Sequence, residues 1–183
     1  MKLKVIGAPD SHEALIKKMS ALSPQRVLDA PAGTGALASK LIEMGHDVHC
    51  ADIDRQHFQL SGVEHTTADL NHGLPQLDNA SFDSVVCCNG AHRLYSLPNA
   101  FQEFARILKP GGNLLINVNN YASIDRRLRF LVYGSLDNAV NAQHCNQNIT
   151  DPAAHVRVAL LVPQLINHLT RAGFEMKAIN AAS

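Results

Sequence analysis

The sequence predicts an α/β protein, a three-layer sandwich in which helices cover both faces of a mostly parallel sheet. Short apolar runs alternate with segments of helical apolar spacing, and the connections between them are short. The chain has 183 residues, of which 46% are hydrophobic and 17% charged, the composition of an ordinary globular protein. We therefore expect one domain.

The first part of the chain predicts repeated strand and helix units. Gly45 closes the second helix, and Asp10 or Ser11 is a plausible cap for the first. In chain order the expected elements are a helix over Ser11–Leu22, a strand over Arg26–Asp29, a helix over Thr34–Met44, a strand over Asp47–Asp52, a short helix over Arg55–Leu60 and a strand over Glu64–Thr67.

The second part continues this alternation and then becomes less regular. A Lys-Pro-Gly-Gly turn precedes the fifth strand, and Gly173 is expected to end the last helix. The expected elements are a strand over Phe82–Cys88, a helix over Asn99–Leu108, a strand over Leu114–Val118, a helix over Ala122–Tyr133, a polar loop or lid over Gly134–Asp151, a helix over Val162–Ala172 and a final strand over Phe174–Ile179.

Composition and charge argue against several classes of protein. With 16 Lys and Arg against 16 Asp and Glu, no sequence-wide basic charge points to nucleic acid or an anionic membrane as partner. No apolar run is long enough to span a bilayer, and no export signal is apparent, so we expect a cytoplasmic protein. The four cysteines and ten histidines form no zinc-type motif, and we expect reduced thiols and no metal.

The segment Asp29–Gly35 is the most informative part of the sequence for function. It follows a predicted strand and places Gly33 and Gly35 at the start of a helix, where a ligand can approach the backbone. Gly33 to Ala38 also fits a relaxed dinucleotide-binding pattern, with Asp52 near the position of an acid that holds a ribose. Asp29 would repel a pyrophosphate, but it suits a ligand that carries a sulfonium and an ammonium.

On Asp29, Gly33 and Gly35 the chain resembles the class I S-adenosylmethionine-dependent methyltransferases. Pro31 stands where the commoner form of their first motif has glycine. Further similarities in order extend the resemblance over about Val27 to Val118. The resemblance implies a Rossmann-like fold, S-adenosylmethionine as cofactor, and transfer of its methyl group to a small-molecule acceptor.

The resemblance also implies roles for particular residues at successive strand ends. Asp52 would accept the ribose hydroxyls and Asp69 the adenine amino group, with Leu70 against the ring. From its position just after the strand, Asp54 is expected to cap the next helix. The expected cofactor-binding residues are Asp29, Ala30, Gly33, Gly35, Asp52, Ile53, Asp69, Leu70 and Cys88.

A weaker similarity in the last third of the chain concerns the acceptor. It resembles the branch that includes the methionine-biosynthesis protein W type, and it makes Asn120, Tyr121, Arg127 and Arg157 candidates for substrate contacts. His92 and His155 are candidate general bases if the acceptor is protonated. An equal alternative is that His92 is an ordinary residue at a helix end or in a loop, with no catalytic role. Whether O, N, S or C is methylated stays open.

The expected organisation is an N-terminal helix region over residues 1–25, a cofactor-binding core over 26–118 and an acceptor-side region over 119–183. The family's sheet has a further antiparallel strand, which we expect to be missing here. The final strand would then pair in parallel with Leu114–Val118, or another chain would cover that edge, which leaves a homo-oligomer open. Two alternative functions remain: an NAD(P)-dependent oxidoreductase and a non-catalytic module that binds S-adenosylmethionine.

Overall fold

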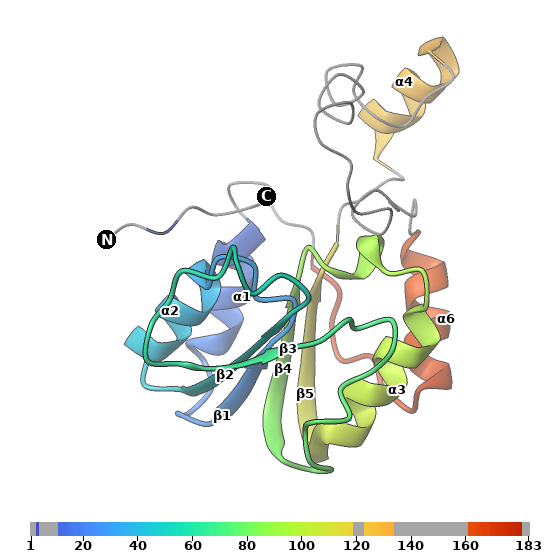
Figure 1. Cartoon of the computed structure of the whole chain (residues 1–183). Coiled ribbons are helices and arrows are strands. Elements are labelled where there is room, and N and C mark those ends of the chain that lie inside the picture. The colour runs from blue at the N-terminus through green and yellow to red at the C-terminus, as the bar shows by residue number, and fades with distance from the viewer. Residues whose placement is uncertain (1–2, 4–10, 119–122, 134–160, 181–183) are drawn as a thin grey trace.

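The protein forms a five-stranded parallel sheet in the order β3-β2-β1-β4-β5 (Figure 1). The computed structural model describes residues 3, 11–118, 123–133 and 161–180. Every neighbouring pair of strands is parallel. The strands are β1 (Arg26–Asp29), β2 (Asp47–Asp52), β3 (Glu64–Thr67), β4 (Phe82–Cys88) and β5 (Leu108–Asn117).

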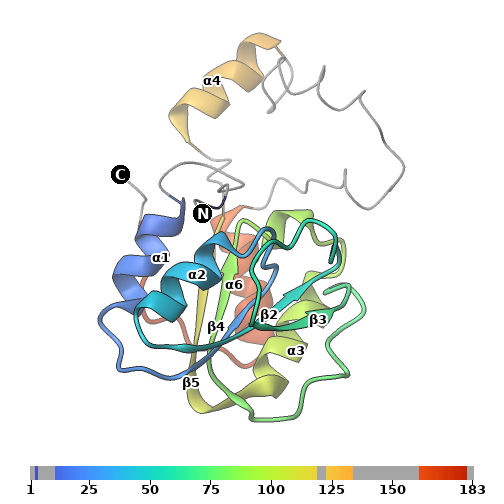
Figure 2. The same cartoon turned by 60° about the vertical axis from the view of Figure 1, so that its left-hand side comes forward.

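Helices cover the two faces of the sheet, as Figures 1 and 2 show. On one face lie α1 (Ser11–Met19) and α2 (Ala36–Glu43), and on the other lie α3 (Leu97–Ile107) and α6 (Val162–Arg171). The 3₁₀ helix η1 (Ala91–Arg93) follows β4, and α4 (Ile124–Tyr133) stands apart from the sheet. The predicted three-layer α/β fold is therefore confirmed.

Two apolar clusters, one on each face, hold the layers together. Side chains alternate between the faces along a strand, so Val27 packs with the α1 and α2 side, whereas Leu28 packs with the α3 and α6 side. In β4, Val86 packs with the α1 and α2 side and Val85 with the α3 and α6 side. These two valines, like Val27 and Leu28, are fully buried. Burial on both faces explains why these strands are continuous apolar runs in the sequence.

The predicted bounds of β1, β2, β3 and β4 are confirmed, and the predicted main helices are present with ends shifted by a few residues. β5 starts earlier than predicted, because Leu108 already pairs with Phe82 before an irregularity at the Lys-Pro-Gly-Gly segment. Gly45 and Gly173 follow their helices with φ of 88° and 91°, as expected of helix-ending glycines.

The short helix predicted over Arg55–Leu60 is wrong. Asp54 accepts hydrogen bonds at Oδ1 from the backbone N–H groups of Gln56 (2.9 Å) and His57 (3.2 Å), which holds this segment in a turn. The expected role of Asp54 as the cap of a helix is therefore wrong as well, because its side chain holds a turn instead. Phe58, 7% exposed, then packs into the α1 and α2 cluster.

The final strand predicted over Phe174–Ile179 is also wrong, because residues 174–180 are not in the sheet. Phe174 donates its backbone N–H to Leu169 at 3.0 Å, which closes the end of α6, and its side chain packs against the apolar cluster on the α3 and α6 face. The side chains that follow are exposed, so a strand here would bury little apolar surface. Cover of the β5 edge by another chain stays a prediction.

The predicted loop Gly134–Asp151 lies outside the described residues. Within the part of the chain that is described, no helix is both long and apolar enough to cross a membrane.

Candidate functional site

The loop after β1 is held between the ends of the two neighbouring strands. The backbone N–H of Ala30 donates to Val86 of β4 at 3.0 Å, and that of Ala32 donates to Ala51 of β2 at 3.0 Å. The Ala30–Pro31 peptide bond is cis. These bonds place the loop at the carboxyl ends of the strands, where ligands bind in open α/β sheets.

Gly33 and Gly35 turn this loop into the start of α2. Their φ angles are 54° and 85°, a region that side chains other than glycine rarely adopt. A Cβ on Gly35 would also lie 2.9 Å from the Cβ of Leu60. No side chain caps α2 at its N-terminus, so the first N–H groups of the helix remain available to a ligand.

Gly90 brings the loop after β4 against the loop after β1. A Cβ on this residue would lie 2.2 Å from Cδ of Pro31, so only glycine allows the two loops to approach this closely. Pro31, the departure from the common family motif, is therefore packed into the site wall. The sequence prediction did not include Gly90.

Asp52, at the end of β2, is 7% exposed and accepts a hydrogen bond at each oxygen. Oδ2 accepts from the backbone N–H of Gly33 at 2.7 Å, and Oδ1 accepts from that of Asp54 at 2.9 Å. The carboxylate thus ties the β2 end to the glycine loop, a contact that the sequence did not predict. Each oxygen retains a lone pair that could accept from a ligand hydroxyl.

Asp29, at the end of β1, is 1% exposed, and neither of its oxygens accepts a hydrogen bond of ordinary geometry from the described residues. The backbone N–H of Ala38 in α2 is near enough to favour the charged form slightly. Burial, together with the charge of Asp52, raises the pKa of Asp29 to about 8. Most molecules of the protein therefore carry this carboxyl in its neutral form at neutral pH.

The cysteines around the site are protonated. Burial is the main cause that raises the pKa of all three thiols, Cys50, Cys87 and Cys88. The pKa of Cys87 rises to about 12 and that of Cys88 to about 11. These three thiols are unsuited to nucleophilic chemistry at neutral pH. Cys88, the predicted cofactor contact, is half-buried at the end of β4, with Sγ 3.9 Å from the backbone oxygen of Ser11.

The three remaining predicted cofactor residues differ in exposure. Ile53 follows Asp52 and is 51% exposed, whereas Leu70 is 4% exposed and belongs to the α3 and α6 cluster. Asp69 accepts at Oδ1 from the backbone and side-chain nitrogens of Asn71, at 2.9 and 2.8 Å. The Leu70 side chain faces the core, so a ligand would meet the backbone at this position.

The predicted acceptor side is placed only in part. His92 lies in η1, just after β4, and is 4% exposed, while Arg127 lies on an exposed part of α4. The candidates Asn120, Tyr121, His155 and Arg157 lie outside the described residues. Their roles, and those of the cofactor residues, stay predictions.

The start of α1 borders the site, which no sequence motif indicated. The backbone oxygen of Ser11, a residue that is 3% exposed, accepts from Nδ2 of Asn117 at 3.2 Å. Asn89, with φ of 52°, donates its backbone N–H to Asn117 at 3.2 Å. The ends of β4, β5 and α1 therefore meet on one side of the glycine loop.

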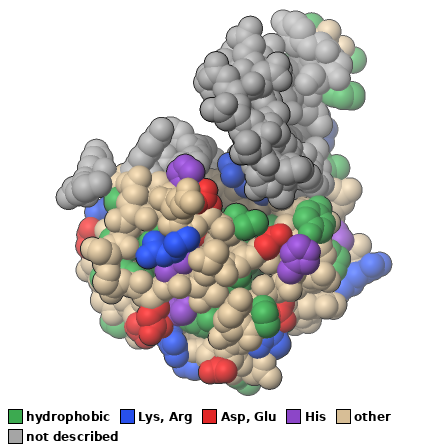
Figure 3. All heavy atoms as spheres, in the orientation of Figure 1, with side chains coloured by type: hydrophobic (Ala, Val, Ile, Leu, Met, Phe, Trp, Pro, Cys, Tyr) green, Lys and Arg blue, Asp and Glu red, His purple; other side chains and the backbone are tan. Residues whose placement is uncertain are grey.

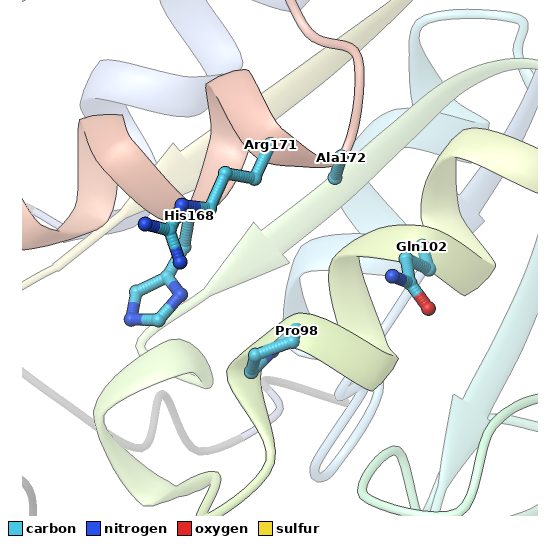
Figure 4. A pocket seen from close by; sticks show the side chains of 5 residues that line it. All are labelled: Pro98, Gln102, His168, Arg171 and Ala172. Atoms are coloured by element: carbon cyan, nitrogen blue, oxygen red, sulfur yellow. The ribbon is translucent and has the colours of Figure 1, made fainter.

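A pocket of about 240 Å³ lies elsewhere, between α3 and α6 (Figure 4). Its lining residues, none of them predicted for the site, are Pro98, Gln102, His168, Arg171 and Ala172. No group of three metal-ligating side chains occurs among the described residues. On the face shown in Figure 3, charged side chains of both signs are interspersed.

Comparisons with known proteins agree with this geometry. A family model described as a methyltransferase domain matches residues 28–116, which include the end of β1, the whole glycine loop and β2 to β4. Over these residues, which are just under half of the chain, the protein is similar to methyltransferase domains. A protein of known structure from Bacillus halodurans has a TM-score of 0.70 at 22% identity, over 93% of this chain and 71% of that one, which shows the same fold.

Two curated relatives are methyltransferases of small molecules. A demethylmenaquinone methyltransferase of Renibacterium salmoninarum is 31% identical over 56% of this chain and 44% of its own. A phthiotriol/phenolphthiotriol dimycocerosates methyltransferase of Mycobacterium leprae is 32% identical over 51% of this chain and 37% of its own. The matches thus span less than half the length of these relatives.

Proposed function

We propose that this chain binds S-adenosylmethionine at the carboxyl ends of β1 to β3 and transfers its methyl group to a small-molecule acceptor. The observation that carries the proposal is the pair of buried carboxyl groups beside the glycine loop. Asp29 accepts no hydrogen bond of ordinary geometry from the described residues, and Asp52 accepts from Gly33 while keeping lone pairs for a ligand. The family match supports the same cofactor.

The residues present fit the parts of this cofactor. The ligand carboxylate suits the uncapped N-terminus of α2, and the ribose hydroxyls suit Asp52. Half-exposed Ile53 offers apolar surface to the adenine ring. Asp29 can supply negative charge to the positively charged groups by giving up its proton. An NAD(P)-dependent oxidoreductase, the first alternative, would place a pyrophosphate beside Asp29 and Asp52, two carboxyl groups that offer it no positive charge.

When bound, the cofactor supplies an electrophilic methyl group on a sulfonium. The protein's contribution is to hold the acceptor in line with that methyl group and to exclude water, and such alignment can be worth about 7 kcal/mol of the barrier. His92, which is buried in η1 after β4, is the proposed base for an oxygen or nitrogen acceptor that must lose a proton. A thiolate or an enolate would need no base.

The acceptor class is proposed from the two curated relatives, whose printed names specify demethylmenaquinone and phthiotriol or phenolphthiotriol lipids. A quinone, quinol or phenol of moderate size is the first class to assay. We further propose that the protein acts in the cytoplasm without nucleic acid or membrane as an obligatory partner, in line with its zero formal net charge.

Calorimetry with S-adenosylmethionine and S-adenosylhomocysteine tests the cofactor part of the proposal. The Asp52→Ala variant should weaken binding by about 1.5 to 3 kcal/mol, the range for a lost charge-assisted hydrogen bond. Asp47→Asn, at the other end of β2, is the matched control and should bind like the unaltered protein. Equal affinity in a folded Asp52→Ala variant would reject the ribose assignment.

An assay for S-adenosylhomocysteine release with a panel of quinols and phenols tests the chemistry. Loss of turnover in His92→Gln, with unchanged cofactor affinity, supports the assignment of His92 as the base. Unchanged turnover in both His92→Gln and His155→Gln shows that neither residue is the base. Cofactor binding without turnover on any acceptor supports the second alternative, a non-catalytic binding module.

A further inference from the structure

Asp29 is enclosed by groups that favour its neutral form. From β2 it faces Asp52 and Cys50, and from β4 it faces Cys87 and Cys88. None of these groups brings a positive charge, and from α2 the backbone N–H of Ala38 is the group that favours the charged form, beside the apolar side chain of Leu37. An ionised carboxylate in such surroundings loses its water and gains too little in return, so burial outweighs this contact.

The two neighbouring carboxyl groups differ in their hydrogen bonds. Asp52 accepts backbone hydrogen bonds at both oxygens, from Gly33 at 2.7 Å and from Asp54 at 2.9 Å. Burial and the charge of Asp52 both raise the pKa of Asp29, whose oxygens receive no comparable bonds. The proton at this pair of carboxyl groups therefore resides on Asp29.

The cofactor and its product differ in charge at this place. S-adenosylmethionine carries a sulfonium and an ammonium, whereas S-adenosylhomocysteine retains only the ammonium. We propose, on the basis of the function proposed above, that binding of S-adenosylmethionine expels the proton of Asp29, and that Asp29 thereby makes the site prefer the methyl donor over the demethylated product. The O–H bond of the carboxyl breaks, the proton passes to solvent, and the carboxylate balances the sulfonium.

The coupling has a defined direction. In the ligand-free protein burial holds the pKa of Asp29 at about 8, and a nearby cation lowers it. Affinity for the methyl donor should therefore rise with pH up to about 8 and then level off. After methyl transfer the sulfonium charge is gone, so Asp29 regains a proton and the product is held less tightly than the donor.

Calorimetry of both ligands at about pH 6.5 and about pH 8.5, in phosphate and in Tris, measures affinity and proton release together. Between the lower and the higher pH, the affinity of the unaltered protein for S-adenosylmethionine should rise about 20-fold more than that of Asp29→Asn, if the pKa of Asp29 falls to about 6 in the complex. S-adenosylhomocysteine should show a clearly smaller gain. The ligand's own ammonium titrates in both proteins, so their difference isolates Asp29.

Asp47→Asn, an exposed acid at the opposite end of β2, is the matched control and should keep the full pH dependence. If Asp29→Asn does not fold, the donor and product are compared on the unaltered protein, and equal proton release for the two overturns the inference. Binding with a pH dependence that Asp29→Asn retains also overturns it and leaves the proposed function standing. Absence of binding of either ligand rejects the proposed function itself.

Discussion

Asp29→Asn should stabilise the ligand-free protein at neutral pH, although it alters a residue of the candidate site. In the unfolded chain the carboxyl ionises near its ordinary pKa of 3.8, whereas burial in the folded protein raises the pKa to about 8. Between these values the folded state holds one proton more than the unfolded state. The contribution of Asp29 to stability is therefore fully present below pH 3.8 and is lost as pH rises through about 8.

The size of the effect follows from the same two pKa values. Each pKa unit corresponds to about 1.4 kcal/mol, so at pH 7 the raised pKa costs the folded state at most about 4 kcal/mol. Asparagine keeps the shape of the side chain without the charge, and its amide is no better paired than a neutral carboxyl. We expect Asp29→Asn to raise the free energy of unfolding at pH 7 by about 2 to 4 kcal/mol.

Urea unfolding of the unaltered protein and of Asp29→Asn, at several pH values between 5 and 8, measures this difference. It should grow by up to about 1.4 kcal/mol per pH unit over that range. Asp47→Asn, whose side chain is 79% exposed, should give a flat difference. A flat difference for Asp29→Asn, or a variant that is less stable at every pH, would refute the reasoning.

Two further substitutions test how the site is held in place. Gly90→Ala should destabilise the protein by about 1 to 3 kcal/mol, because its Cβ would meet Pro31 at 2.2 Å. Gly62→Ala is the control for backbone strain without a clash, because Gly62 has φ of 76° and open space around it. Equal losses of unfolding free energy for the two variants in urea would contradict the importance of the clash. Arg106→Lys should cost about 1 to 3 kcal/mol and speed hydrogen exchange in residues 74–79, because Arg106 donates to the carbonyls of Leu74 (2.9 Å) and Leu77 (2.8 Å). Exchange that is unchanged in this loop would show that Arg106 does not hold it.

The sheet could be predicted from the sequence because its strands are local signals. Val27 and Leu28 lie in a short apolar run that ends in Asp29 and a glycine turn, and both are fully buried on opposite faces. β4 shows the same kind of run. Strand ends then placed Asp29 and Asp52 at one edge of the sheet without any knowledge of contacts.

The two wrong elements failed for a different reason. Arg55–Leu60 has residues that tolerate a helix, but the Asx turn at Asp54 and the packing of Phe58 decide the conformation. Phe174–Ile179 begins with alternating apolar and polar residues, as a strand can, but membership of a sheet depends on a partner that local sequence does not specify. Tertiary context decided both.

The environment of the carboxyl groups could not be predicted either. The bond from Gly33 to Asp52, the close approach of Gly90 to Pro31, and the contact of Ser11 with Asn117 all join residues far apart in the sequence. A motif names the residue types of a site but not which oxygen is already occupied. That Asp29 accepts no hydrogen bond of ordinary geometry from the described residues while Asp52 accepts two is a property of the folded loop.

A crystal structure of the protein with S-adenosylhomocysteine would show directly where the cofactor binds. We expect electron density for the ligand over the loop Gly33–Gly35, with its ribose hydroxyls within hydrogen-bond distance of Asp52. Density in the pocket between α3 and α6, beside His168 and Arg171, with the glycine loop left empty, would contradict this expectation.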